Sequence, residues 1–412
     1  MDRLVVCQAA LCFIGWSSNN HFKDAMYWSG IAISQAHSLR LQREDAYADL
    51  EEGERRLRRR LWWIVVMREC DVSLSMGRPP RIWPHGLRML DHDDFSDRDP
   101  LEFEGWARIG EIRRDHVLLK RLEMACIEKA KLAVSVYRIL HLPKEDAVNS
   151  NAKVWQLAAE LKEWRLQLPP ELGCLTSSTH ALDETDRSLQ ISMSVVNLMH
   201  WMAVAVLHKA EVLLSGWTPS PGGDTTLSHA GISSHEHVRA MRHAANEITS
   251  VHAALHKQNL TQFLPAFGVA TVCAAVFVHL LDARSSQALL RRTSLEHLDV
   301  CVDVLRELGH LNYTATDVSK IVESAAHAVC NHPLSSDDNS GGHHTRSNPY
   351  DPALSVSLTE GEMRKHLVSR DMAFSSAHLR DTLDTIGQTM GQCDPVGMEN
   401  FFDFDMDEFI ML

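Results

Sequence analysis

The chain is 412 residues long, with 45% hydrophobic and 23% charged residues and a formal net charge of −13. This negative charge excludes a protein that binds nucleic acid over its whole surface, since such binding needs a basic surface. Nine scattered cysteines, none of them in a C-x-x-C pair, exclude a zinc site of that type and a thioredoxin motif. They are typical of reduced, buried thiols.

The first residues predict two helices. Residues 1–16 form an apolar helical stretch, and residues 17–20 (Ser-Ser-Asn-Asn) form a turn. From Phe22 to Leu41 the apolar positions recur every three or four residues, which indicates one face of a helix.

The next stretch, Glu54 to Ile82, organises the rest of the chain. Five arginines occupy six consecutive positions and lead directly into the apolar run LWWIVVM. Acids precede three of these arginines by four residues, which supports a helix, and Gly77 and Pro79 predict its end. The arginine run is open to two interpretations, a nucleic-acid or nuclear-import segment and a solvated helix face neutralised by acids. Leu57 and Leu61 interrupt it at core spacing, which favours the second.

Ionisable residues also occur inside the apolar half of this helix. A buried charge needs a partner, so we expect Asp71 to form an ion pair with Arg68 or Arg78. A structural latch is favoured over an active site here. The acids that follow in residues 91–99 lack the spacing of a calcium loop, so we expect a solvated acidic loop.

The remaining body also has helical periodicity. We expect a long, once-broken helical pattern over 103–140, a helix Lys153–Leu168 capped from residues 149–151, and a helix Arg187–Leu214 capped by Thr185 or Asp186. Further helices are expected over Ser234–Lys257, Pro265–Ala283, Ser294–Leu308 and Ala315–Cys330. No alternating strand pattern occurs, so the predicted fold class is all-α. Residues 263–281 have the length of a membrane span but contain Pro265, Gly268 and His279, which favours a buried central helix and no membrane.

The C-terminal part differs in composition. Residues 331–355 predict a disordered linker, and residues 356–412 a mostly disordered region. Its last segment, 394–412, alternates acids with apolar residues and has no base, which is the composition of an activation domain. A helix packed against the body is the alternative. The residues expected to contact a coactivator are Phe401, Phe402, Phe404, Asp405 and Phe409.

No motif for catalysis or for metal binding emerges. The sequence has no H-E-x-x-H, no phosphate-binding glycine loop and no G-x-S-x-G, so we predict that the chain is not an enzyme. The 24 histidines include pairs such as His200 with His208 and His235 with His237, but none has a third ligand at convincing spacing. We expect them to lie on helix faces and to be satisfied by hydrogen bonds.

Three segments of the sequence resemble a known family. The chain resembles the fungal-specific transcription factor domain, closest to the cutinase transcription factor type, in the segments YWSGIAISQAHSLRLQRED, ERRLRRRLWW and DVSLSMGRPPRI. That family usually has glycine where Arg40 stands and histidine where Gln42 stands, which concerns one helix end. The residues of this structural signature are Arg59, Arg60, Leu61, Trp62, Trp63, Asp71, Gly77, Arg78 and Pro79.

The resemblance implies an all-helical regulatory domain over 1–330 in a nuclear regulator of RNA polymerase II transcription. In the family, the hairpin formed by the two helices predicted over 1–16 and 22–41 lies in the middle of the domain. We therefore expect the chain to be N-terminally incomplete. It also implies DNA binding through a zinc-loaded cysteine cluster, for which this chain offers no residues. Coactivators, and a homo- or heterodimer with a DNA-binding relative, are the partners expected. The alternatives are an inhibitor of full-length relatives, and a small-molecule binder or enzyme with a pocket near Trp62, Met199 and Trp201.

Overall fold

The computed structural model describes residues 2–14, 25–84, 87–96, 116–142, 147–172, 184–214, 229–285, 287–310 and 312–331. Within them the chain forms helices and no strand, which confirms the all-α prediction. The α-helices are α1 (Arg3–Phe13), α2 (Ala25–Ser38), α3 (Glu52–Met76), α5 (His116–Leu140), α6 (Ala147–Leu166), α7 (Glu184–Leu214), α8 (His229–Lys257), α9 (Phe267–Asp282), α10 (Ala288–Gly309) and α11 (Tyr313–Asn331). Short 3-10 helices are η1 (Glu44–Tyr47), η2 (His92–Phe95), η4 (Pro170–Leu172) and η5 (Thr261–Phe263). The expected linker and activation segment lie outside the described residues.

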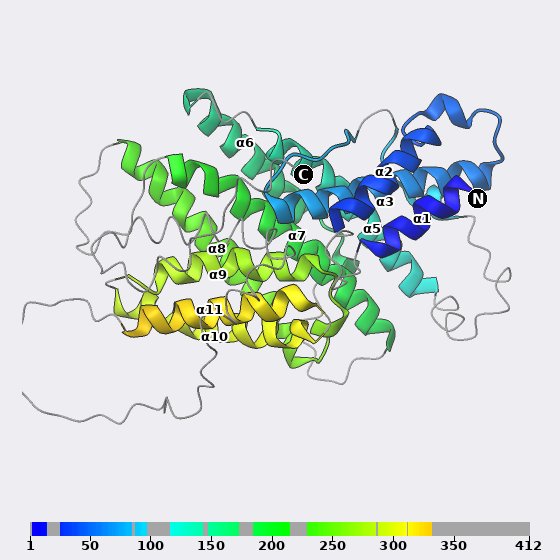
Figure 1. Ribbon diagram of the computed structural model, residues 1–412. Helices are drawn as coiled ribbons and strands as arrows, with labels where there is room; N and C mark the ends of the chain where they lie inside the picture. The colour runs from blue at the N-terminus through cyan, green and yellow to red at the C-terminus, as the bar shows by residue number, and fades with distance from the viewer. Residues whose placement is uncertain are drawn as a thin grey trace, which may run out of the picture.

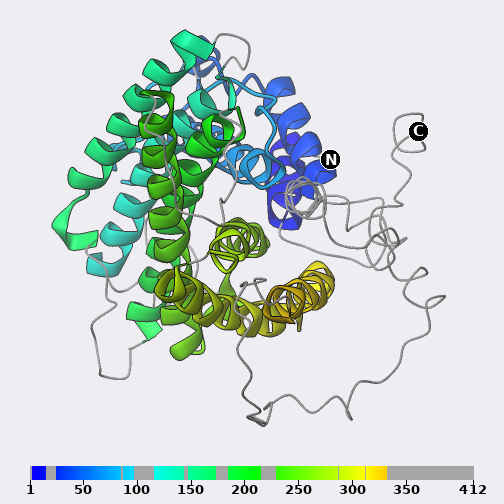
Figure 2. The same ribbon diagram turned by 90° about the vertical axis from the view of Figure 1, so that its left-hand side faces the viewer.

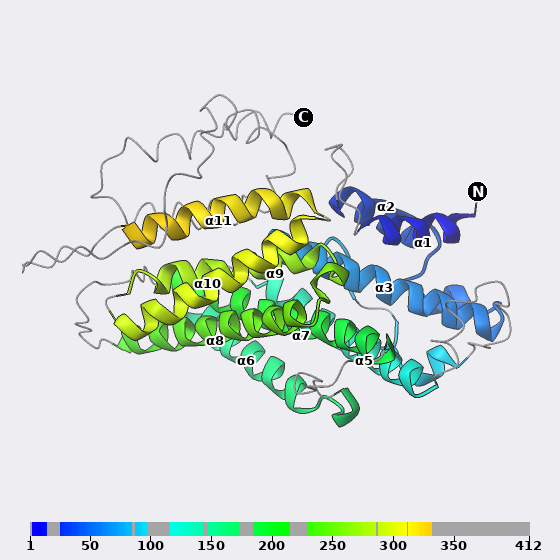
Figure 3. The same cartoon turned by 90° about the horizontal axis from the view of Figure 1, so that it is seen from below.

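The helices are arranged around α3, α7 and α9. The hairpin of α1 and α2 packs on α3 at one end of the molecule, and α8, α10 and α11 lie toward the other end (Figures 1 and 3). Helix α5 connects α3 to α7, while α6 packs against α5 and α7. Helix α9 is enclosed by its neighbours, as the view along its axis shows (Figure 2), because it packs against α3, α7, α8, α10 and α11.

The burial of α9 confirms one prediction from the sequence. All but one of its residues are buried, and it joins a hydrophobic core that extends from α1 to α11. The 16-residue helix is therefore the buried central helix expected over this stretch. Among the described helices, one is long and apolar enough to cross a membrane, Arg187–Lys209 of α7, but 78% of its most apolar window is buried inside the fold. Such a segment is typical of a core helix.

Two helix starts differ from the sequence prediction. Residues 149–151 were expected to cap a helix, yet α6 begins earlier, at Ala147. Thr185 and Asp186 likewise lie inside α7, which begins at Glu184. Polar residues that favour caps also fit the first turn of a helix, where the backbone N–H groups have no intrahelical partner. A polar side chain near a helix start therefore marks the region and not the first residue.

Three helices, α2, α3 and α8, are each followed by a residue in the left-handed conformation. Gly77 after α3 has φ 62°, Arg40 after α2 has φ 54°, and Asn259 after α8 has φ 56°. In each case the next residue donates its N–H back to a carbonyl five residues earlier, as in the bond from the Leu41 amide to the Ala36 carbonyl at 3.0 Å. This Schellman geometry favours glycine. The position where the resembling family has glycine is therefore one that needs a positive φ.

Candidate functional site

Helix α3 carries most of the signature residues, and its first turns are held by local ion pairs. Glu52 pairs with Arg55 at 2.8 Å and with Arg56 at 3.3 Å, while Glu54 pairs with Arg58 at 2.8 Å. These pairs lie three or four residues apart, which places both charges on one side of the helix. The acids before the arginines thus stabilise the start of the helix, as the spacing predicts.

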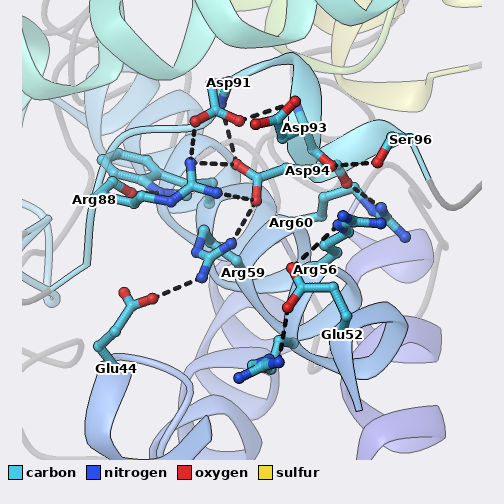
Figure 4. A network of polar contacts seen from close by, with 12 residues as sticks. Glu44, Glu52, Arg56, Arg59, Arg60, Arg88, Asp91, Asp93, Asp94 and Ser96 are labelled. Atoms are coloured by element: carbon cyan, nitrogen blue, oxygen red, sulfur yellow. Dashed lines mark hydrogen bonds and ion pairs between the residues drawn. The ribbon is translucent and has the colours of Figure 1, made fainter. Parts of the chain in front are cut away.

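The last arginines of the run behave differently, because they enter the interior. Arg59 is buried and pairs with Asp94 of η2 at 2.5 Å and with Glu44 of η1 at 2.6 Å. Arg88 contacts both carboxylate oxygens of Asp94, at 2.9 and 2.8 Å, and Arg60 donates to the Asp94 backbone carbonyl (Figure 4). The Asp94 carboxylate, with no exposed surface, is therefore surrounded by two guanidinium groups.

This cluster, which we call the Asp94 latch, corrects two expectations. The arginine run was expected to be a solvated face, but Arg59 lies inside and holds two 3-10 helices against α3. The acids of 91–99 were expected to be solvated, but Asp94 is buried, and Asp91 and Asp94 form the capping box of η2. The sequence could not show this, because the partners of Asp94 lie 35 and 6 residues away.

A second buried carboxylate is Glu69 of α3, one of the ionisable residues that the sequence places inside the apolar half of this helix without identifying its partners. It accepts hydrogen bonds from Ser29 of α2 at 2.6 Å and from the Arg81 side chain at 2.9 and 2.8 Å, and Arg78 lies 3.9 Å away. Burial alone would raise the pKa of Glu69, but the hydrogen bonds from Arg81 and Ser29 outweigh burial and lower this pKa below its usual value. Glu69 therefore stays ionised and joins α2, α3 and the segment after α3.

The predicted ion pair of Asp71 is confirmed in part. Arg68 lies 3.7 Å from its carboxylate, whereas the closest cation is Lys129 of α5, at 2.7 Å. Arg78, the other expected partner, lies near Glu69 instead. Because Lys129 comes 58 residues later in the chain, the sequence could not identify it. The latch interpretation holds, but the pair connects α3 to α5.

The aromatic part of the signature forms the core. Leu61, Trp62 and Trp63 are all buried, and the Trp63 indole donates to the Arg88 carbonyl at 3.0 Å. Pro79 is exposed and follows Gly77, where α3 ends. Trp62 is only 1% exposed, which is characteristic of a core side chain.

The other residues of the pocket expected near Trp62, Met199 and Trp201 are core side chains as well. Met199 is fully buried and Trp201 is 7% exposed, and both belong with Trp62 to the continuous hydrophobic core. Their burial accounts for these residues without a ligand. The buried His200 ring next to them stacks on the Trp164 ring, with ring centroids 5.2 Å apart.

The histidines form buried contacts between α7, α8 and α9. The His208 and His237 rings meet through their Nδ1 atoms at 2.8 Å, a pair that the sequence did not bring together. Thr271 donates to the Gly268 carbonyl at 2.7 Å, so its oxygen is free to accept the 2.9 Å hydrogen bond from His252. Burial lowers the pKa of His252 to about 3, and burial followed by the charge of His237 lowers the pKa of His208 to about 4. These histidines are neutral structural groups. The expected hydrogen bonds are found at His208, His237 and His252, but the Nδ1 atoms of His200 and His252 make none within the protein.

Among the described residues, no group of three or more His, Cys, Asp or Glu side chains is arranged to hold a metal ion. The zinc cluster that the resemblance implies needs closely spaced cysteines, and the described ones are dispersed, buried at Cys7, Cys70, Cys273 and Cys301 and accessible at Cys12 and Cys126. The residues on α3 are thus ion-pair latches and core side chains, which set the shape of a helical domain. No step of chemistry follows from them.

Comparisons with known proteins identify a matching family model and several relatives of this chain. The family model described as fungal specific transcription factor domain matches residues 1–202, which include all of α3 and the Asp94 latch. The chain is 26% identical over 350 residues to cutinase transcription factor 1 beta of Fusarium vanettenii, covering 77% of this chain and 38% of that relative. It is 26% identical over 334 residues to the acetamidase regulatory protein of Aspergillus fumigatus, covering 79% and 38%. The chain thus spans less than two fifths of the length of these relatives, and no solved structure matches it.

Proposed function

We propose that this chain, which carries a fungal specific transcription factor domain over residues 1–202, is the regulatory part of a transcription regulator acting on RNA polymerase II genes. The observation that carries the proposal is the similarity over about three quarters of the chain to relatives named as transcription factors and regulatory proteins. A helical body held by buried latches supports a role in binding and regulation and not in catalysis. Such a regulator works in the nucleus.

The two parts of the chain have different roles in this proposal. The helical body 2–331 positions partners, including a second copy or a DNA-binding relative that supplies the zinc cluster. The segment 394–412, with six acids, four phenylalanines and no base, contacts a coactivator through its apolar side chains. The acids keep such a segment open by mutual repulsion, and the phenylalanines gain free energy by entering an apolar groove of the partner.

A reporter assay tests the proposal. The complete chain, fused to an unrelated DNA-binding domain, should activate a reporter gene that carries the matching site. Replacing Phe401, Phe402, Phe404 and Phe409 by alanine should abolish the activation, because the groove contacts are lost.

The matched control replaces two phenylalanines that are exposed on the described body, Phe13 and Phe263, by alanine. This variant should activate as strongly as the parent fusion. A parent fusion that stays silent at equal abundance would contradict the proposal, and equal losses in the two variants would remove the role of segment 394–412.

A further inference from the structure

The hairpin of α1 and α2 differs in composition from the rest of the body. Its described residues, 2–14 and 25–38, include two residues of the types Asp, Glu, Lys and Arg, namely Asp2 and Arg3, whereas these types make up 23% of the chain. The hairpin lies at one end of the molecule, with α1 at its outer edge (Figures 1 and 3). A surface that is depleted of charge is characteristic of the core of a protein interface.

Helix α1 is apolar on both of its sides. The residues that it buries on the side toward α2 and α3 are Cys7, Ala10 and Leu11. The other side exposes Val5, Ala9 and Cys12, and the side chain of Val5 is 54% exposed. A helix that is apolar all round is normally buried all round. Within the part of the chain that the structure describes, the outer side of α1 therefore lacks the cover that its composition requires.

The three exposed residues lie along one line of the helix. Val5, Ala9 and Cys12 are four and three residues apart, which is the spacing of a seam along which two helices pack. This line is also nearly symmetrical about Ala9, whose small side chain allows two helices to approach closely. Phe13 borders the line, where its ring stacks on the Trp28 ring of α2 with centroids 4.7 Å apart.

We propose that the outer side of α1 is an interface for a second copy of this chain, packed antiparallel about a twofold axis near Ala9. Val5 of each copy then faces Cys12 of the other copy, and the two Ala9 side chains meet at the axis. A twofold pair uses the same patch on both partners, so the patch has to complement itself. The near-symmetry of the line about Ala9 meets this requirement.

The charge of the two partners also favours a second copy. Each chain has a formal net charge of −13, so two copies repel each other least where both surfaces are neutral, and no residue from Leu4 to Phe13 is charged. The acidic segment 394–412 and a nucleic acid would both need bases, which this side of α1 does not carry. Because the hairpin is at one end of the molecule, the two bodies extend away from the contact (Figure 1).

The proposed contact is small, and this sets the expected affinity. Helix α1 has 11 residues and is therefore about 16 Å long, so a pair of such helices buries less than the roughly 1,200 Å² of a standard interface. We expect a reversible dimer that forms at about 10–100 μM chain. The inference deepens the proposed function, on which its role in regulation rests. The association experiment involves no transcription, so the two proposals can fail separately.

Sedimentation equilibrium of the complete chain tests the interface. The parent should change from monomer to dimer as its concentration rises. Ala9→Glu should weaken the dimer at least about ten-fold, because two like charges meet at the axis, and Ala9→Lys should do the same. An equimolar mixture of these two variants should associate more tightly than either alone, because opposite charges then face each other. Ala159→Glu, at an exposed alanine of α6, should dimerise like the parent.

A disulfide tests the antiparallel register. In Val5→Cys the introduced thiol should face Cys12 of the second copy and form an interchain disulfide under air oxidation. The two positions are seven residues apart in one helix, which is too far for a bridge within one chain. Adding Cys12→Ser to this variant should prevent the crosslink. Arg3→Cys, which is exposed at the same end of α1 but off the line, should not form it.

Several results would overturn the inference. A parent that stays monomeric up to about 100 μM lacks this interface, and if Cys12 then also resists a thiol reagent, another segment of the chain covers α1. Equal weakening by Ala9→Glu and Ala159→Glu would place the dimer contact elsewhere. The twofold arrangement is wrong if mixing the Ala9→Glu and Ala9→Lys variants restores no association, or if the crosslink persists in Val5→Cys with Cys12→Ser.

Discussion

At the scale of single residues, the domain depends on carboxylates that have lost contact with water. Asp94 and Glu69 have no exposed surface. Asp94 accepts from Arg59 of α3 and from Arg88, and Glu69 accepts from Ser29 of α2 and from Arg81. A buried ion pair contributes little net free energy when compared with apolar side chains, but removing one partner leaves an uncompensated charge. The latches therefore fix which segments meet, and the loss of a single member is costly.

The Asp94 latch gives a prediction for unfolding by urea. Asp94→Ala should lower the free energy of unfolding by about 3–5 kcal/mol, because Arg59 stays buried without its main partner. Arg59→Met should also destabilise, but the double variant should lose less than the sum, by about 0.5–3 kcal/mol. The exposed pair of Glu54 and Arg58 on the same helix is the control, for which the same cycle should give about 0.3–0.5 kcal/mol. Additive losses at Asp94 and Arg59 would show that the latch is not an energetic unit.

At the scale of helices, the sequence predicted the elements well where periodicity and end signals agree. Helix α3 combines acids before arginines, a continuous apolar run and Gly77, and it was found between Glu52 and Met76. What the sequence could not predict is which helices meet. Lys129 reaches Asp71 across 58 residues, and His208 meets His237 across 29, so neither contact leaves a local pattern. Helix starts were also missed, because cap residues fit the first turn equally well.

The end of α2 gives a prediction for a single helix. Arg40 has φ 54°, a conformation that costs a side chain with a Cβ atom roughly 1–2 kcal/mol. Arg40→Gly should therefore raise the free energy of unfolding by about 1 kcal/mol, whereas Gly77→Ala at the matching position after α3 should lower it by a similar amount. Urea unfolding of the two variants measures both changes. A loss of stability in Arg40→Gly would mean that contacts of the arginine side chain outweigh its backbone strain.

The buried histidines of α8 and α9 give a prediction for pH. Burial lowers the pKa of His252 to about 3, whereas an unfolded histidine titrates near 6.5. Between these values the unfolded state binds more protons, so stability is complete above about pH 6.5 and falls as the pH falls toward 3. In His252→Gln the slope of the unfolding free energy between pH 6 and 4 should decrease by up to about 1.4 kcal/mol per pH unit. His235→Gln, at an exposed position of the same helix, is the control, and an equal change in both variants would contradict the assignment.

At the scale of the whole molecule, charge and architecture point the same way. The body has a continuous core from α1 to α11. Most of its arginines form ion pairs with acids in the interior or nearby in the sequence, as in the Asp94 latch. A surface that attracts the phosphate backbone needs unpaired bases gathered on one face, and the formal net charge of −13 opposes it. Under the proposed function, the helical body, of which residues 1–202 match the family model, therefore serves regulation and partner binding, and DNA contact comes from a separate zinc-bearing module.

This division of roles gives the last prediction. The purified chain 1–412 should show no site-selective affinity for duplex DNA near physiological salt and should hold no stoichiometric zinc. The physical reasons are the net charge and the absence of any C-x-x-C pair in the sequence. Gel shifts with a pool of random duplexes, together with metal analysis of the purified chain, measure both quantities. Any weak binding that does occur should decrease steeply with salt and should not distinguish sequences, since contacts to phosphates alone carry no sequence information. Selective, salt-resistant binding by the chain alone would require a base-reading surface on the helical body and would overturn the division.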